Sequence, residues 1–141
     1  MTGRLVLLTA FLVGPSPVAY AQTHPCDTTP TPNPIVKNTY RVQFCWDAKD
    51  LDGNPILPAD VQMRLAIDGT AQALRALPTP ISAPNATGSA LYEYAGLASL
   101  KGAHSITVTA VTAEGEATSV PFAYAVKGGP PKPPLVPRVA Q

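Results

Sequence analysis

The sequence predicts an all-β fold, an antiparallel β-sandwich of two sheets, on the strength of two observations. Apolar residues recur at every second position in several short runs, which is the period of a half-buried strand. Gly, Pro and Asp separate these runs, and no window has the apolar spacing and the caps of an amphipathic helix. Because the two faces of each run differ in polarity, we expect antiparallel sheets with one face on the core.

The strand pattern is found in five runs. They cover residues 40–46, 61–67, 92–94, 104–110 and 120–126. Their inward positions hold most of the aromatic residues, namely Tyr40, Phe44, Trp46, Tyr92, Tyr94, Phe122 and Tyr124. The weaker segment 72–77 is either an edge strand or a short helical turn. An exposed edge near residues 70–77 could accept a partner strand. The expected loops are residues 50–60, 78–88 and 114–117.

The N-terminus has the pattern of a secretory signal peptide, residues 1–21. Arg4 precedes an apolar run over 5–13, and Ala19 and Ala21 form a small-residue site that predicts cleavage after Ala21. The run is shorter than the roughly 20 residues that span a bilayer, although a retained anchor helix is the alternative. We therefore expect a secreted or periplasmic protein.

Two proline-rich segments flank the predicted sandwich, which covers residues 35–127. Residues 22–34 form a lead-in that is expected to be extended, because proline suits neither a helix nor a paired strand. Residues 128–141 form a second such segment, which favours polyproline II. This tail is interpreted as a spacer, with a ligand for a proline-recognition module as the alternative.

The charge balance argues against two classes of partner. The precursor has ten basic and nine acidic residues, and removal of residues 1–21 removes Arg4, which leaves nine of each. Nucleic acids and anionic membranes are bound mainly through excess Lys and Arg. We therefore expect no nucleic acid as a partner, and no membrane insertion after cleavage.

Two cysteines in an exported chain predict a disulfide between Cys26 and Cys45, with two free thiols as the alternative. Cys45 alternates with the inward Trp46, so it is expected on the outer face of its strand. The bridge would then hold the lead-in against the outside of the sandwich and would not cross the core.

From about residue 35 to 126 the chain resembles a fibronectin type III domain. Trp46 ends the second strand, where that family keeps a buried tryptophan, and residues 104–115 are similar to its F strand and following turn. The tyrosine that normally opens this strand is His104 here, the corner 97–104 is one residue longer, and the first strand is poorly defined. The resemblance implies a role in binding, adhesion or spacing, and a structural core that includes Trp46, Tyr92, Tyr94, Leu97, His104 and Val108.

Acidic residues in the segment 47–55 could form a calcium loop, but the EF-hand spacing fails. With Gly53 at the sixth position of such a loop, Ala48 and Ala59 stand where ligands are required. The segment is therefore interpreted as a polar turn. His24 and Cys26 would make a weak transition-metal site, and no metal or cofactor is predicted.

No catalytic residues are predicted. Glu93, Glu114 and Glu116 form no evident carboxylate pair, and no nucleophile motif is present. The sequon that begins at Asn85 matters only in a eukaryotic host. The sequence therefore predicts a non-catalytic module that binds another envelope or extracellular protein. A small-molecule or polysaccharide-binding module is the second hypothesis, and the inward aromatics argue against sugar binding. An enzyme with an unrecognised site is the third.

Overall fold

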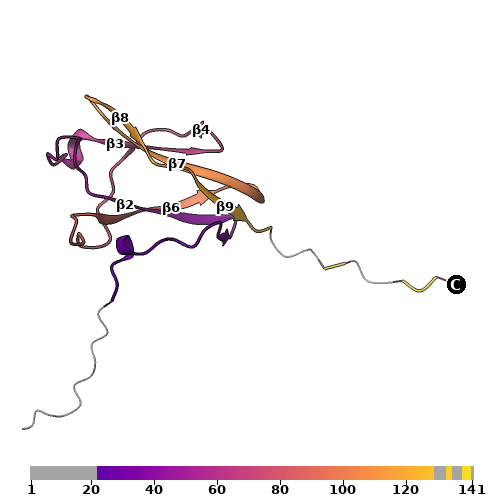
Figure 1. Ribbon diagram of the computed structural model, residues 1–141. Helices are drawn as coiled ribbons and strands as arrows, with labels where there is room; N and C mark the ends of the chain where they lie inside the picture. The colour runs from indigo at the N-terminus through magenta and orange to yellow at the C-terminus, as the bar shows by residue number, and fades with distance from the viewer. Residues whose placement is uncertain (1–21, 129–132, 135–137, 141) are drawn as a thin grey trace, which may run out of the picture.

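The computed structural model describes residues 22–128, 133–134 and 138–140. The predicted signal peptide and its cleavage after Ala21 lie outside the described residues, as does part of the tail. The described residues form two layers of strands that face each other (Figure 1). The predicted all-β sandwich is thereby confirmed.

One layer is a two-stranded antiparallel sheet of β2 (Thr39–Trp46) and β6 (Ala90–Ala98). The other layer has the order β1-β9-β7-β3-β4, with β5 also on β3 and β8 also on β7. Its strands are β1 (Ile35–Val36), β3 (Gln62–Ile67), β4 (Thr70–Ala71), β5 (Arg75–Ala76), β7 (Gly102–Thr112), β8 (Gly115–Thr118) and β9 (Phe122–Val126). Two single-turn 3-10 helices are present: η2 (Pro25–Asp27) lies in the lead-in before β1, and η3 (Pro58–Asp60) lies in the connection between β2 and β3. The pairing is antiparallel throughout the described strands except between β1 and β9, which are parallel.

The structure corrects two expectations near the C-terminal strand. Residues 114–117 were expected to be a loop, but β8 begins at Gly115 and forms a hairpin with β7. Val120 was expected on the inward face, yet it precedes β9 and is 83% exposed. Pro121 provides the reason, because a residue without an N–H interrupts the ladder and separates β8 from β9.

The segment 72–77 contains an edge strand and not a helical turn. Asp68 and Gly69, with φ of 52° and 81°, make the two-residue turn that reverses the chain from β3 into β4. β4 and β5 each pair with β3 over only two residues. Such a short edge offers a partner strand few main-chain groups.

The core lies between the inward faces of the two sheets, and Leu65 at its centre has no exposed surface. A bulge in the two-stranded sheet shifts the register between Tyr40 and Val42. Gly96 on the paired strand β6 has φ of 74° and lies at this bulge. The bulge turns both Tyr94 and Leu97 toward the core, although they are three residues apart. The buried cluster comprises Tyr40, Val61, Met63, Leu65, Tyr94, Leu97, Ile106, Tyr124 and Val126.

Candidate functional site

The two sheets are joined along one side of the sandwich. The Tyr94 hydroxyl on β6 donates a hydrogen bond to the Ala76 carbonyl on β5, at 2.6 Å. The Arg75 guanidinium lies 5.4 Å from the centre of the Tyr94 ring, which is the geometry of a cation–π contact. These contacts connect β5, at the edge of one sheet, to β6 of the other sheet, so this side of the sandwich is closed.

The opposite side is open, because β2 pairs with β6 alone among the described strands. The lead-in passes this edge, but Pro30, Pro32 and Pro34 have no N–H with which to extend a ladder. The chain instead crosses to the other sheet, where Ala125 N donates to the Pro34 carbonyl at 2.9 Å. One edge of β2 therefore keeps its main-chain groups without a strand partner in the described structure.

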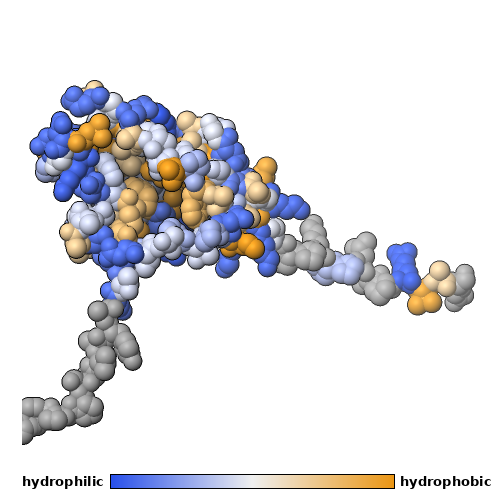
Figure 2. Space-filling view, viewed as in Figure 1, coloured by the Kyte–Doolittle hydropathy of each residue, from blue (hydrophilic) through white to orange (hydrophobic). Residues whose placement is uncertain are grey.

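A cavity of about 350 Å³ lies beside this free edge, between β2 and the start of β9. A second cavity of about 300 Å³ continues it toward Trp46 and shares Phe44, Cys45, Val108 and Ser119 with the first. We call the two together the open-side groove. Figure 2 shows apolar side chains exposed in a hollow between the two layers. The apolar residues that line the groove include Val42, Phe44, Trp46, Val108, Val120 and Phe122.

The groove leaves part of the inward face of β2 uncovered. Val42, Phe44 and Trp46 point toward the other sheet but are only half-buried. Phe44 stacks on Tyr92, with 5.3 Å between the ring centres, so its position is fixed by aromatic packing. The groove is therefore a preformed surface that exposes apolar side chains beside the free edge of β2.

The six residues expected in the core occupy three different environments. Tyr92, Tyr94 and Leu97 are buried between the sheets. Trp46 and Val108 are half-buried and line the groove, and His104 is half-buried near the start of β7. Sequence reasoning missed the groove because it assumed that the inward face of β2 is fully covered. The prolines of the lead-in were the available signal, since they prevent that segment from acting as a first strand.

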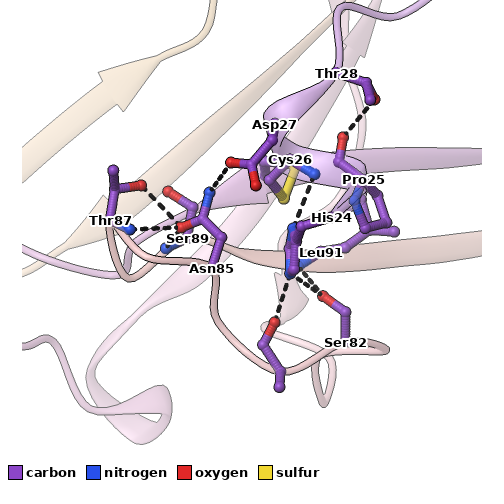
Figure 3. The surroundings of a disulfide bond; sticks show 12 residues. His24, Pro25, Cys26, Asp27, Thr28, Ser82, Asn85, Thr87, Ser89 and Leu91 are labelled. Carbon is purple, nitrogen blue, oxygen red and sulfur yellow. Dashed lines mark hydrogen bonds between the residues drawn. A yellow bond between two sulfur atoms is a disulfide. The ribbon is translucent and has the colours of Figure 1, made fainter. Parts of the chain in front are cut away.

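The predicted disulfide joins Cys26 to Cys45, with 5.7 Å between their Cα atoms (Figure 3). His24 Nδ1 accepts a hydrogen bond from Cys26 N at 3.0 Å, and His24 Nε2 lies 2.6 Å from the Ala83 carbonyl. Asp27 accepts a hydrogen bond from Asn85 Nδ2 at 2.7 Å. The lead-in is therefore fixed to β2 by a covalent bond and to the loop before β6 by polar contacts.

The side chains considered above as metal ligands or as a glycan acceptor take part in these contacts. Cys26 is oxidised, and both ring nitrogens of His24 have partners, so neither side chain is free to ligate a metal. Asn85 Nδ2, the atom to which a glycan would be attached, is bound to Asp27. Asn85 Oδ1 accepts from the backbone N–H groups of Thr87 and Ser89, so this side chain organises its own loop.

The acidic segment after β2 is a polar turn. Asp50 Oδ1 accepts hydrogen bonds from the backbone N–H groups of Asn54 and Asp52, at 2.8 and 2.9 Å. These bonds, that from Asn54 first, lower the pKa of the Asp50 carboxyl. The described residues contain no group of three or more His, Cys, Asp or Glu side chains arranged to hold a metal ion.

Within the described part of the chain, no helix has the length and apolar character needed to cross a bilayer. No family model, curated protein or solved structure matches the chain.

Proposed function

We propose that this chain is a non-catalytic exported β-sandwich module that binds another envelope or extracellular protein, and that the open-side groove takes an extended segment of that partner. The observation that carries the proposal is the apolar groove beside the free edge of β2. An extended peptide can use both features at once. Its main chain hydrogen-bonds to the strand edge, and alternate side chains enter the groove.

The size and lining of the groove suit a peptide side chain better than a sugar. Its larger cavity, at about 350 Å³, is at the small end of the range for ligand pockets, roughly 300–1,000 Å³. Its walls are mainly aliphatic and aromatic, and Trp46 presents only part of its ring to solvent. A small apolar molecule is the second candidate, and the same apolar lining favours it over a polysaccharide.

The proposed relationship to fibronectin type III domains is supported by the strand order. In immunoglobulin-like sandwiches the second strand pairs with the fifth, and the third, sixth and seventh form the facing sheet. Here β2 pairs with β6, and β3, β7 and β9 lie in the other layer. The first strand is the one that departs, because its proline-rich half makes no pair with β2. Export is supported by the Cys26–Cys45 disulfide, which persists in an oxidising compartment.

A non-catalytic role is supported by how the charged side chains are used. Arg64 and Glu116 form a two-point ion pair across β7, with the shorter contact at 2.7 Å. Asp68 is bonded to His104 and to the backbone of Ser105. In these pairs the titratable groups are bonded to one another on the surface of the sheet and do not converge on the groove.

A photo-crosslinking amino acid at Val120 tests the proposal, since this residue lines the groove and is 83% exposed. Leu100, which is 84% exposed and outside the groove, is the matched control position. We expect crosslinking at Val120 to give a discrete protein adduct in the host envelope or medium, and crosslinking at Leu100 to give none. Equal adducts at both positions, or none at Val120, would contradict the proposal.

A further inference from the structure

We infer that the segment received by the open-side groove is the proline-rich C-terminal tail, residues 129–140, of a second copy of this chain. The inference rests on the groove of the proposed function and makes a second copy of this chain the exported protein whose segment the groove takes. It makes the contact head-to-tail, because the tail of one molecule would enter the groove of the next.

The lining of the groove suits proline. Four aromatic residues contribute to its larger cavity, and prolines of the lead-in already form part of the same wall. Proline-rich segments bind aromatic-lined grooves because the polyproline II conformation is formed in advance and little entropy is lost on docking. The residues concerned are Tyr40, Phe44, Phe122 and Tyr124, with Pro30 and Pro34 from the lead-in.

The tail has a composition that matches this surface. It contains prolines at 130, 131, 133, 134 and 137, and the aliphatic residues Leu135, Val136 and Val139. Its described residues are exposed, and Val139 is 94% exposed. A single molecule therefore presents an apolar groove and an apolar tail, and in the described structure neither covers the other.

The length of the tail permits the contact between molecules. Thirteen residues follow Gly128, which in polyproline II span about 40 Å at about 3.1 Å per residue. The eight residues of β2 span about 26 Å at about 3.3 Å per residue. The tail can thus leave its own domain and still run along the whole edge of β2 in a neighbour.

The main chain of the tail also suits an edge. Prolyl carbonyls accept hydrogen bonds from the free N–H groups of β2, whereas prolines cannot donate to a second strand on the far side. The tail would therefore cover the edge and end the sheet there. The donor and acceptor surfaces differ, so such a contact is heterologous and forms rings or open chains.

Three variants of the mature chain, residues 22–141, test this inference. Val120→Lys places a charge in the groove, the double variant Leu135→Asp, Val139→Asp places charges in the tail, and Leu100→Lys is the control with a matched exposed site. Because all of these sites except Leu135 are described as exposed, folding is expected to be retained, and circular dichroism checks it. Molar mass is measured by light scattering over a range of concentrations.

We expect the wild type and Leu100→Lys to associate as concentration rises, and the groove and tail variants each to remain monomeric. A mixture of the groove variant and the tail variant should form one-to-one dimers, since one supplies an intact tail and the other an intact groove. A synthetic peptide of residues 128–141 should bind the tail variant, whose groove is intact. Adding Val120→Lys to the tail variant should weaken that binding about tenfold or more.

A wild-type chain that stays monomeric at every concentration would overturn the inference, as would association that Val120→Lys leaves unchanged. Failure of the mixed variants to form dimers would also overturn it, because it would exclude a head-to-tail contact. A monomeric wild type whose Val120 position still crosslinks to a different protein would separate the two proposals. The groove would then keep its proposed function, and the tail would not be its occupant.

Discussion

His104 lies between two acceptors near the start of β7. Its Nδ1 is 2.6 Å from Asp68 Oδ2, and its Nε2 faces the Leu100 carbonyl. Neutral imidazole has one N–H, so only the imidazolium donates to both acceptors. The Asp68 carboxylate is accordingly the main cause that raises the pKa of His104, and the same bond is the main cause that lowers the pKa of Asp68. When protonated, His104 thus bridges Asp68 and Leu100 at the position where the fibronectin type III resemblance leads one to expect a tyrosine.

The groups around this pair set the pH range in which it contributes. The Tyr124 ring centre is 5.6 Å from that of His104, and burial raises the pKa of Tyr124 to about 12, so this neighbour stays neutral. His104 stabilises the fold fully below its unfolded pKa of about 6.5, and the contribution is lost as pH rises through the raised folded value. Asp68 contributes above its unfolded value of about 3.9 and less as pH falls through its lowered folded value.

We therefore predict that His104→Gln destabilises the protein most near pH 5 to 6, where Asp68 is ionised and His104 is protonated. The destabilisation should become smaller as pH rises above the folded pKa of His104. Urea unfolding at a series of pH values measures the difference in the free energy of unfolding between variant and wild type. The uncharged substitution Leu51→Ser, at an exposed site with no contact to His104 or Asp68, serves as a control whose effect should not follow this profile. A difference that is constant across pH would show that the ion pair does not titrate as described.

At the scale of elements, the free edge of β2 follows from the proline content of the segment before it. Prolines at 30, 32 and 34 remove donors from the stretch that would otherwise pair with β2, and the disulfide fixes that stretch in place. β7 is the opposite case, because it pairs with β3 on one edge and with β8 and β9 on the other. The two strands have similar alternation in sequence and differ in how many neighbours satisfy their main chain.

This difference predicts unequal protection of the backbone amides. Hydrogen exchange followed by mass spectrometry should show faster exchange for peptides from β2 than for peptides from β7, since part of the main chain of β2 faces solvent. Addition of the tail peptide, residues 128–141, should slow exchange in β2 and leave β4 unchanged. Equal protection of β2 and β7 in the free protein would argue that the edge is already covered.

The disulfide predicts a second result at this scale. The double variant Cys26→Ser, Cys45→Ser should lower the free energy of unfolding by about 3 kcal/mol, because a closed loop of this length restricts the unfolded chain. The lead-in should also become more sensitive to proteolysis, while the core between the sheets is retained. His24→Ala, which keeps the bridge and removes the contact to Ala83, is the control and should have a smaller effect. Urea unfolding and limited proteolysis measure both quantities.

At the scale of the molecule, the sandwich has one closed and one open side. The hydrogen bond from Tyr94 to Ala76 closes the first, and the groove occupies the second. Trp46, the single tryptophan of the chain, lies at one end of that groove and is half-buried. Its fluorescence therefore reports on whatever occupies the open side.

This position separates the candidate ligands. Binding of an apolar or proline-rich peptide should shift the emission of Trp46 to shorter wavelength, because solvent is displaced from the ring. Soluble glycans should leave it unchanged, since the groove is lined mainly by apolar residues. A saturable shift on addition of a glycan, abolished by Val120→Lys, would instead favour the polysaccharide hypothesis.

The sequence by itself determined the all-β class, the positions of the main strands, the Cys26–Cys45 pairing and the outward direction of that bridge. These follow from local rules, since side chains alternate along a strand and two cysteines allow one intramolecular pair. It also indicated a corner role for His104, but not its partner Asp68, because the two are brought together only by strand pairing.

The tertiary structure decided which strand edges are satisfied and which side of the sandwich is open. Alternation shows which face of β2 is inward. How fully that face is covered depends on the path of the lead-in, which does not pair with β2 and continues into β1 in the other sheet. Periodicity likewise missed the break at Pro121 that makes β8 a separate strand and leaves Val120 exposed in the groove. The candidate site thus depends on the free edge of β2. Which strand edges stay free is set by pairing between residues distant in sequence, which no local sequence pattern contains.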